Sequence, residues 1–265
     1  MKKTAKAAAL VAAVVLAAGL TACQKKDGAA ASGAAQQPAG TAKAAKAAKP
    51  TPVNEFSREL TEDSSGVRIL EYNGSAKSVV IPAEIEGLPV KEIVEEAFYD
   101  NTTLKSVTIP DSVEKIGESA FMNCESLTSV IIPDSVEKID EFVFCNCDSL
   151  KSVTFGNSVQ EISDDAFANT ALESVTIPDS VKKIGSSAFS GCTALKSVTL
   201  GNSVQEIGRY VFSGCTALQS LAIPDSLQKI KFVVNSYGKN DAFKDTELPL
   251  ATQARLKALG YTDSF

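Results

Sequence analysis

The sequence predicts a repeat solenoid, built from stacked parallel β-strands that are joined by turns and short helical segments. Three observations predict this fold. Similar segments recur every 23 residues, each segment carries the same apolar positions, and one of those positions is always phenylalanine. A single segment has about eight apolar residues and cannot close a core alone, so neighbouring segments must stack on one another.

The period is seen in five segments aligned on their valine. The period is 23 residues except in the third copy, where it is 22. Partial units lie on both sides of the five, at 90–109 and from Leu227 onward. The five segments are VEKIGESAFMNCESLTSVII (113–132), VEKIDEFVFCNCDSLKSVTF (136–155), VQEISDDAFANTALESVTI (159–177), VKKIGSSAFSGCTALKSVTL (181–200) and VQEIGRYVFSGCTALQSLAI (204–223).

The phenylalanine position forms the clearest column of the predicted core. Because successive copies stack, equivalent rings should lie one above another as a spine. The column consists of Phe98, Phe121, Phe144, Phe167, Phe189, Phe212 and Phe243.

Each copy also predicts one strand followed by one turn. Ser106-Val107-Thr108-Ile109 alternates polar and apolar residues, as a half-buried strand does. The turn is Pro-Asp-Ser in some copies and Gly-Asn-Ser in others, and both dipeptides favour turns. This exchange disfavours a calcium-binding function for the aspartate column, since carboxylate ligands are hard to replace by asparagine throughout a site. The aspartates concerned are Asp111, Asp134, Asp179 and Asp225.

The consensus I-P-x-S-V-x-x-I-x-x-x-A-F-x-x-C-x-x-L-x-S-V resembles the BspA-like, or treponemal-type, leucine-rich repeat. The resemblance covers about 79–243 and implies a leucine-rich-repeat solenoid. Tyr72-Asn73-Gly74, followed by Ile81-Pro82, is similar to the N-terminal capping strands of that family. The resemblance also implies function, because known members are bacterial surface proteins, several of which bind host extracellular-matrix proteins or other cells.

The N-terminus predicts export. Three lysines in residues 1–6 precede an apolar stretch over 7–20, which is too short for a comfortable transmembrane helix. Leu20-Thr21-Ala22-Cys23 resembles the lipobox of bacterial lipoproteins, which implies cleavage after residue 22 and lipidation of Cys23. Gln24, by the same analogy, favours the outer membrane or cell surface. The alternative is an ordinary signal peptide with an incidental cysteine.

The chain therefore divides into three predicted parts. Residues 1–22 are the signal peptide, and 23–53 are a tether rich in Ala, Lys and Pro that cannot bury enough surface to fold. Residues 54–265 are the solenoid. Within it we expect capping strands over about 54–89, repeats over about 90–246 and a C-terminal cap helix over about 247–260, with Pro249 at its start and Gly260 at its end.

Composition excludes several functions. The sequence has no histidine, which removes every Ser–His or Cys–His catalytic pair and every histidine metal site. Residues 54–265 carry 31 acidic and 18 basic side chains, which disfavours a nucleic-acid partner. The pair Asp164-Asp165 aligns with serines in other copies and is interpreted as solvated surface. We expect no enzyme activity, no metal and no cofactor.

The outward residues of the strands form the candidate binding face. This face of small hydroxyl groups and scattered charges suits an extended protein partner better than a small molecule, which needs a deep pocket. The serine column beside it, Ser106 to Ser220, has an alternative role in strand packing. The candidate residues are Lys105, Thr108, Thr128, Lys151, Thr154, Glu173, Thr176, Lys196, Thr199 and Gln219.

Two functional hypotheses follow. The first is a membrane-anchored surface protein that adheres to a host extracellular-matrix protein or to other cells. The alternative is an envelope scaffold lipoprotein that faces the periplasm and has an internal protein partner. Both need the same lipid anchor and tether.

Two further features leave alternatives open. An insertion in the seventh unit, at 231–241, is either a loop packed over the last rung or a contact loop. Five cysteines besides Cys23 either occupy small buried positions or form bridges between neighbouring rungs, Cys124 to Cys147 and Cys192 to Cys215. Cys145 with Cys147 gives only a weak indication of a metal site.

Overall fold

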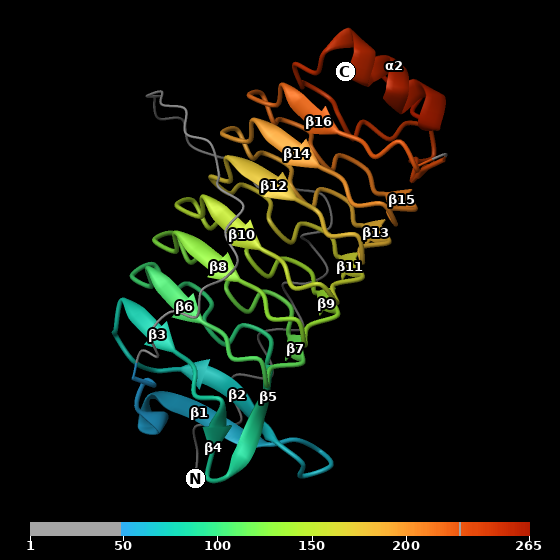
Figure 1. Ribbon diagram of the computed structural model, residues 1–265. Helices are drawn as coiled ribbons and strands as arrows, with labels where there is room; N and C mark the ends of the chain where they lie inside the picture. The colour runs from blue at the N-terminus through green and yellow to red at the C-terminus, as the bar shows by residue number, and fades with distance from the viewer. Residues whose placement is uncertain (1–48, 228) are drawn as a thin grey trace. The chain divides into compact units, whose positions relative to one another are not determined.

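The computed structural model describes residues 49–227 and 229–265, and these residues form a stack of similar coils. The signal peptide, Cys23 and most of the tether lie outside the described residues. Each coil contributes one strand to each of two rows, which run up the two sides of the stack in Figure 1. The predicted solenoid with stacked parallel strands and a C-terminal helix is confirmed.

The first row consists of the three-residue strands that the Ser-Val-Thr alternation predicts. Their middle residues point into the core and their flanking residues point outward, because side chains alternate along a strand. The row is made of two sheets, in the orders β10-β8-β6-β3 and β12-β14-β16, all parallel. The strands are β3 (Ser78–Val80), β6 (Ser106–Thr108), β8 (Ser129–Ile131), β10 (Ser152–Thr154), β12 (Ser174–Thr176), β14 (Ser197–Thr199) and β16 (Ser220–Ala222).

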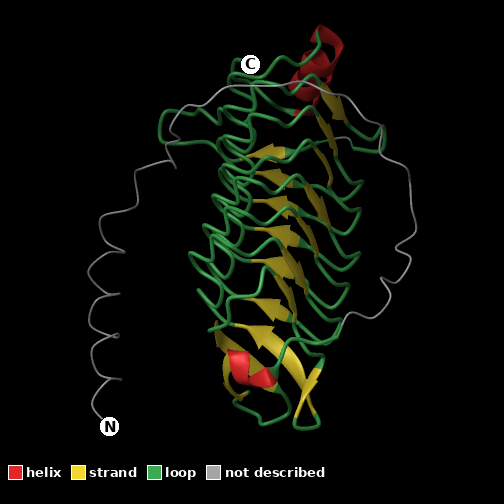
Figure 2. Cartoon of the chain, turned by 90° about the vertical axis from the view of Figure 1, so that its left-hand side faces the viewer, coloured by secondary structure: helices red, strands yellow, loops and turns green. Residues whose placement is uncertain are grey.

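The second row is a continuous sheet in which every strand after the six-residue first one has two residues. The sequence pattern did not predict these short strands, because two residues are too few to show alternation. Each two-residue strand has one charged residue that is exposed or half-buried, followed by an apolar residue, which is a buried isoleucine in all but β17, where Phe232 is half-buried. Figure 2 shows both rows within the stack of coils. The strands are β5 (Leu88–Ile93), β7 (Lys115–Ile116), β9 (Lys138–Ile139), β11 (Glu161–Ile162), β13 (Lys183–Ile184), β15 (Glu206–Ile207) and β17 (Lys231–Phe232).

The N-terminal end is covered by an antiparallel pair. A short 3-10 helix, η1 (Val53–Glu55), leads into β1 (Phe56–Leu60), which pairs with β2 (Val67–Tyr72), and β2 continues the second row in parallel with β5. The small strand β4 (Glu84–Ile85) pairs antiparallel with β5.

Residues at the end of the predicted tether also take part in the fold. Thr51 is buried, its N–H donates to the carbonyl of Val80, and its hydroxyl accepts from the Val80 N–H, with both distances 2.9 Å. The ordered chain therefore includes Thr51, before the predicted solenoid boundary at residue 54.

The predicted phenylalanine spine is confirmed. Ring centroids of successive coils lie 4.7–5.6 Å apart from Phe98 to Phe243, with the planes nearly parallel. Tyr72 extends the stack at one end, and Tyr261 packs edge-on against Phe243 at the other. Aromatic pairs at such distances are favourable beyond their burial, so the spine joins the coils along their whole length.

We expected short helical segments between the strands. Between the second-row strand and the phenylalanine, the chain instead forms turns that contain residues with a left-handed backbone conformation. In the copy at 136–155, Phe142 has φ 58° and its N–H donates to the carbonyl of Asp164 on the next coil. A second left-handed position holds Asn146, whose side-chain amide bonds to Asn123 at 2.9 Å. The bonds between coils hold these strained conformations in place.

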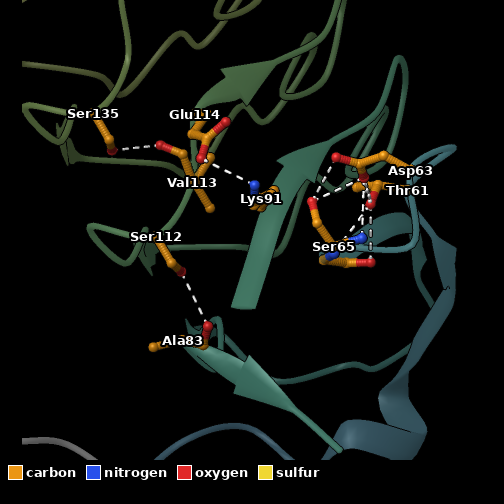
Figure 3. Close-up of polar contacts among 10 residues, drawn as sticks. Thr61, Asp63, Ser65, Ala83, Lys91, Ser112, Val113, Glu114 and Ser135 are labelled. Carbon is orange, nitrogen blue, oxygen red and sulfur yellow. Dashed lines mark hydrogen bonds and ion pairs between the residues drawn. The ribbon is translucent and has the colours of Figure 1, made fainter. Parts of the chain in front are cut away.

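The Pro-Asp-Ser turns are also tied from coil to coil. The hydroxyl of Ser112 donates to the carbonyl of Ala83 at 3.0 Å, and the hydroxyl of Ser135 donates to the carbonyl of Val113 (Figure 3). The Asp134 carboxylate accepts from the N–H of Asn157. These hydrogen bonds satisfy backbone groups at the turns. They explain why turn-forming residues recur at these positions although aspartate and asparagine replace each other.

Figure 3 also shows the loop between β1 and β2. The Asp63 carboxylate accepts from the hydroxyl of Thr61 and from the N–H and hydroxyl of Ser65. These hydrogen bonds, that of Thr61 first, hold the pKa of Asp63 well below its usual range. The loop is thus closed by its own side chains at the edge of the cap.

The C-terminal end is covered by helix α2 (Leu250–Leu259), which begins after Pro249 and ends at the left-handed Gly260, as predicted. Leu256 and Leu259 face the core, and Arg255 donates to the carbonyl of Leu227 at 2.6 Å. The helix therefore covers the apolar end of the last coil. Among the residues that the structure describes, no helix combines the length and apolar character that crossing a membrane requires.

Candidate protein-interaction surface

The ten candidate residues all lie along the first row of strands, and all ten are exposed. The four threonines end their strands, while the other six residues immediately precede a strand. The sequence therefore identified residues that share one side of the stack, and we call this surface the strand face. We define it by Lys105, Thr108, Thr128, Lys151, Thr154, Glu173, Thr176, Lys196, Thr199 and Gln219.

The register of the strands aligns the threonine positions from coil to coil. Thr176 pairs with Thr199, and Thr199 pairs with Ala222, while Thr154 pairs with Ile131. The serine column is aligned in the same way, and at one end the hydroxyl of Ser106 donates to that of Ser78 at 2.8 Å. Small side chains thus leave the strand face open to a partner's backbone, and part of the serine column serves local hydrogen bonding.

One edge of the strand face is mainly basic. Lys105, Lys151 and Lys196 precede alternate strands, with Glu173 as the one acidic residue in the same column. Among the described residues, these four side chains form no ion pair. Their charges remain available to a partner, in a solenoid whose other charged positions are mostly acidic.

The second row carries a ladder of opposite charges that sequence reasoning missed. Glu161 pairs in register with Lys183, and their side chains meet at 3.0 Å; Glu206 meets Lys231 at 2.8 Å. The column changes sign from copy to copy in the sequence. Oppositely charged neighbours across strands stabilise the register, so the reversal has a structural cause.

A hollow of about 600 Å³ lies over the first strands of the second row. Basic side chains, including Arg68 and Lys115, and carboxylates, including Glu118 and Glu141, line it. Burial raises the pKa of Glu118, and the nearby Glu141 and Glu95 carboxylates raise it further. The hollow is open and charged, which is unlike the enclosed apolar pocket of a small-molecule site.

Comparison with known proteins places the repeats in a family. The sequence profile of the BspA-type leucine-rich repeat region matches with six copies, at residues 69–195 and 160–249. The chain belongs to the BspA-type leucine-rich repeat family. This assignment confirms the resemblance found in the sequence, and the fold of this family is a scaffold for binding other proteins.

Solved structures of other leucine-rich repeat proteins agree with the family assignment. The T. pallidum protein TpLRR has 36% sequence identity and a TM-score of 0.74, over 82% of this BspA-type chain and 99% of its own. A leucine-rich repeat protein from Bacteroides ovatus has 26% identity and a TM-score of 0.58, over 75% and 57% of the two chains. None of the curated proteins matches the sequence.

The cysteine column of this BspA-type solenoid lies in the core. The thiols of Cys124 and Cys147 donate to the carbonyl oxygens of Phe98 and Phe121, and those of the two later copies do the same to Phe167 and Phe189. Burial raises the pKa of Cys124 to about 12, and it raises that of Cys147 still more clearly above its usual range. The geometry favours the interpretation of small buried residues.

We expect these thiols to be unreactive in the folded protein, because a thiolate is the reactive form and burial suppresses it. A chain that begins at residue 24 should take up no iodoacetamide at pH 8 on the time scale of minutes, and it should take up five equivalents in guanidinium chloride. Mass spectrometry measures both. Rapid alkylation of any of the five in the folded state would contradict the buried geometry.

The structure shows where the two ends of the insertion in the seventh unit lie. At its base Phe232 packs against Tyr261 with ring centroids 5.2 Å apart, and the buried Asn240 side chain donates to the carbonyl of Gly208 at 2.9 Å. At its tip Tyr237 is 87% exposed. The base therefore packs over the last coil while the tip stands free of it.

Proposed function

We propose that this protein is a lipid-anchored bacterial surface protein that binds another protein through the strand face. Adhesion to a host extracellular-matrix protein or to another cell is the role we assign to this binding. The observation that carries the proposal is the row of exposed, small and regularly spaced side chains, edged by lysines that form no ion pair among the described residues. Solenoids use such extended surfaces for protein partners.

The anchor is part of the same proposal. Its support is the lysine-rich start of the chain, the apolar stretch over 7–20 and the Leu-Thr-Ala-Cys motif that ends at Cys23. Several acyl chains on one cysteine give lasting membrane attachment, where a single chain gives only marginal binding. The tether would then hold the solenoid away from the bilayer.

Protease treatment of intact cells tests the surface location. We expect the solenoid to be degraded without cell lysis, and a Cys23→Ser variant to lose membrane attachment. Full protection of the protein on intact cells would overturn the surface location and support the periplasmic scaffold instead. A cytosolic protein that stays intact in the same sample controls for lysis.

Binding to a panel of purified matrix proteins tests the strand face. We expect saturable binding to at least one, and the double variant Thr176→Arg, Thr199→Arg should weaken it by about tenfold or more, because bulky charges there obstruct the strand face. The matched control is Thr193→Arg, Thr216→Arg, which places the same substitution on exposed turns outside the strands. Equal loss in both variants would contradict the role of the strand face.

A further inference from the structure

A hollow of about 350 Å³ lies beside the end of β2, at the N-terminal end of the stack (Figure 1). It is lined by the end of β2, by the segment after it, and by the turn around Phe98, the first phenylalanine of the spine. None of its lining residues belongs to the strand face. Four of them carry the argument, namely Glu71, Glu96, Tyr99 and Asp100.

Tyr99 puts an aromatic ring where the other copies have none. Its side chain is 42% exposed, and it directly follows the phenylalanine of the spine. A coil therefore needs no aromatic residue at this place, and the ring is available to a partner. The equivalent residues of the later units are Met122, Cys145, Ala168, Ser190, Ser213 and Lys244.

Asp100 carries a charge that its structural role does not require. Its carboxylate accepts from the side-chain amide of Asn123 at 2.6 Å, and one coil further on Asn123 accepts in the same way from Asn146 at 2.9 Å. An asparagine at residue 100 could accept the hydrogen bond equally well, because its amide oxygen is also an acceptor. The hydrogen bonds between coils therefore do not explain the negative charge of Asp100.

The hollow is acidic and has no base of its own. Glu71, Glu96 and Asp100 line it, no lysine or arginine does, and these three carboxylates form no ion pair among the described residues. Lys77 and Lys105 come two positions after lining residues in the sequence, but they do not line the hollow themselves. We call this feature the acidic hollow.

The carboxylates of the acidic hollow act on the tyrosine beside them. Burial raises the pKa of Tyr99, and the charges of Asp100 and Glu96 raise it further. A positive charge in the acidic hollow would instead be attracted by the same carboxylates and by the face of the aromatic ring. The lining is thus complementary to a cation.

We propose that the acidic hollow binds the guanidinium or ammonium group of an arginine or lysine side chain on a protein partner. Ionised carboxylates are the strongest hydrogen-bond acceptors for these groups, and the tyrosine ring offers a face over which the cation can lie. The inference goes beyond the proposed function, because it assigns a second contact point that lies outside the strand face.

A peptide titration tests the preference for a cation. The chain that begins at residue 24 is titrated with a short, fluorescently labelled peptide that has Arg-Arg at its centre. The control peptide has citrulline at both positions, which keeps the shape of the side chain without its charge. We expect saturable binding of the arginine peptide and binding of the control weaker by about fivefold or more. No binding of the arginine peptide at millimolar concentration would overturn the proposal, as would equal binding of both peptides.

NMR of the tyrosine rings locates the bound peptide. The chain has five tyrosines, so carbon-13 labelling of their rings gives few signals, and a Tyr99→Met variant identifies the signal of Tyr99. We expect this signal to shift during the titration. Tyr237 is 87% exposed and lies in the seventh unit, far from the acidic hollow, so its signal should not move. An unshifted Tyr99, or a shift of Tyr237 as large as that of Tyr99, would contradict the proposal.

Asp100→Asn is the decisive variant, because it keeps the acceptor for Asn123 and removes the charge. The protein should fold normally and bind the arginine peptide about fivefold more weakly or worse. The matched control is Asp245→Asn. Asp245 occupies the same place in the last unit, with φ 62° against 57° for Asp100, but it follows Lys244. Equal weakening in both variants would mean that only net charge matters, and the acidic hollow would be wrong.

Two further variants complete the test. If Asp100→Asn fails to fold by circular dichroism, Glu96→Gln takes its place and should weaken binding in the same way. The double variant Thr176→Arg, Thr199→Arg alters the strand face alone, so it should leave the affinity for the arginine peptide within about twofold of the original. If it weakens this binding as much as Asp100→Asn does, the peptide binds the strand face and the proposal falls, while the proposed function stands.

Discussion

Replacing Phe144 by alanine is expected to lower the free energy of unfolding by about 3–5 kcal/mol. Phe144 is fully buried in the middle of the spine, with ring centroids 5.3 Å from both Phe121 and Phe167. The substitution leaves a cavity and also removes two stacked pairs, each worth about 0.5–1.5 kcal/mol beyond burial. Urea denaturation followed by circular dichroism measures the change.

The matched control lies two residues earlier in the same coil. Phe142 is partly exposed and has a left-handed φ of 58°, a conformation that asparagine tolerates better than phenylalanine. We therefore expect Phe142→Asn to be neutral or slightly stabilising. If both substitutions destabilised the protein equally, the stacked spine would not be the main link between coils.

Replacing Gly156 by alanine is expected to cost about 2–3 kcal/mol, against the usual effect of this substitution. A Cβ at this position would lie 2.5 Å from the carbonyl oxygen of Pro133 and 2.8 Å from the Cα of Asp134, both on the preceding coil. These are backbone atoms, so relief requires the two coils to separate. At an unstrained site without such contacts, Gly→Ala stabilises by about 0.4–1 kcal/mol through the unfolded state.

The sign of the change in unfolding midpoint therefore decides between the two effects. Asn157→Ala is the control, because that side chain is exposed in the same turn and the backbone N–H that bonds to Asp134 is kept. We expect little change from the control. A stabilising Gly156→Ala would mean that the coils are further apart at this corner than the structure shows.

The sequence alone was sufficient for the phenylalanine spine and the first row of strands. Every copy has phenylalanine in one column, and these side chains can be buried only when the copies stack on one another. The Ser-Val-Thr alternation assigns one side of each strand to the core. The strand face follows from the same alternation. Its ten residues could be named without coordinates because each depends only on its place in the repeat.

Other features depended on contacts between coils, which no single copy reveals. The left-handed position of Phe142 is occupied by Ser187 two coils on and by Tyr210 three coils on, so its residue types carry no common signal. Backbone hydrogen bonds to the neighbouring coil hold the conformation instead. The charge ladder of Glu161 and Lys183 likewise became visible only once the register of the second row was known.

The shortened third copy shows the division most clearly. The sequence determined that one residue is missing, and it placed the loss between the phenylalanine and the following strand. Only the tertiary structure decided that the second row absorbs the loss while the first row loses its strand pairing between β10 and β12. The physical reason is that the shortening lies between Asn169 and Leu172, in the turn that leads into β12, so β12 is the first strand after it along the chain.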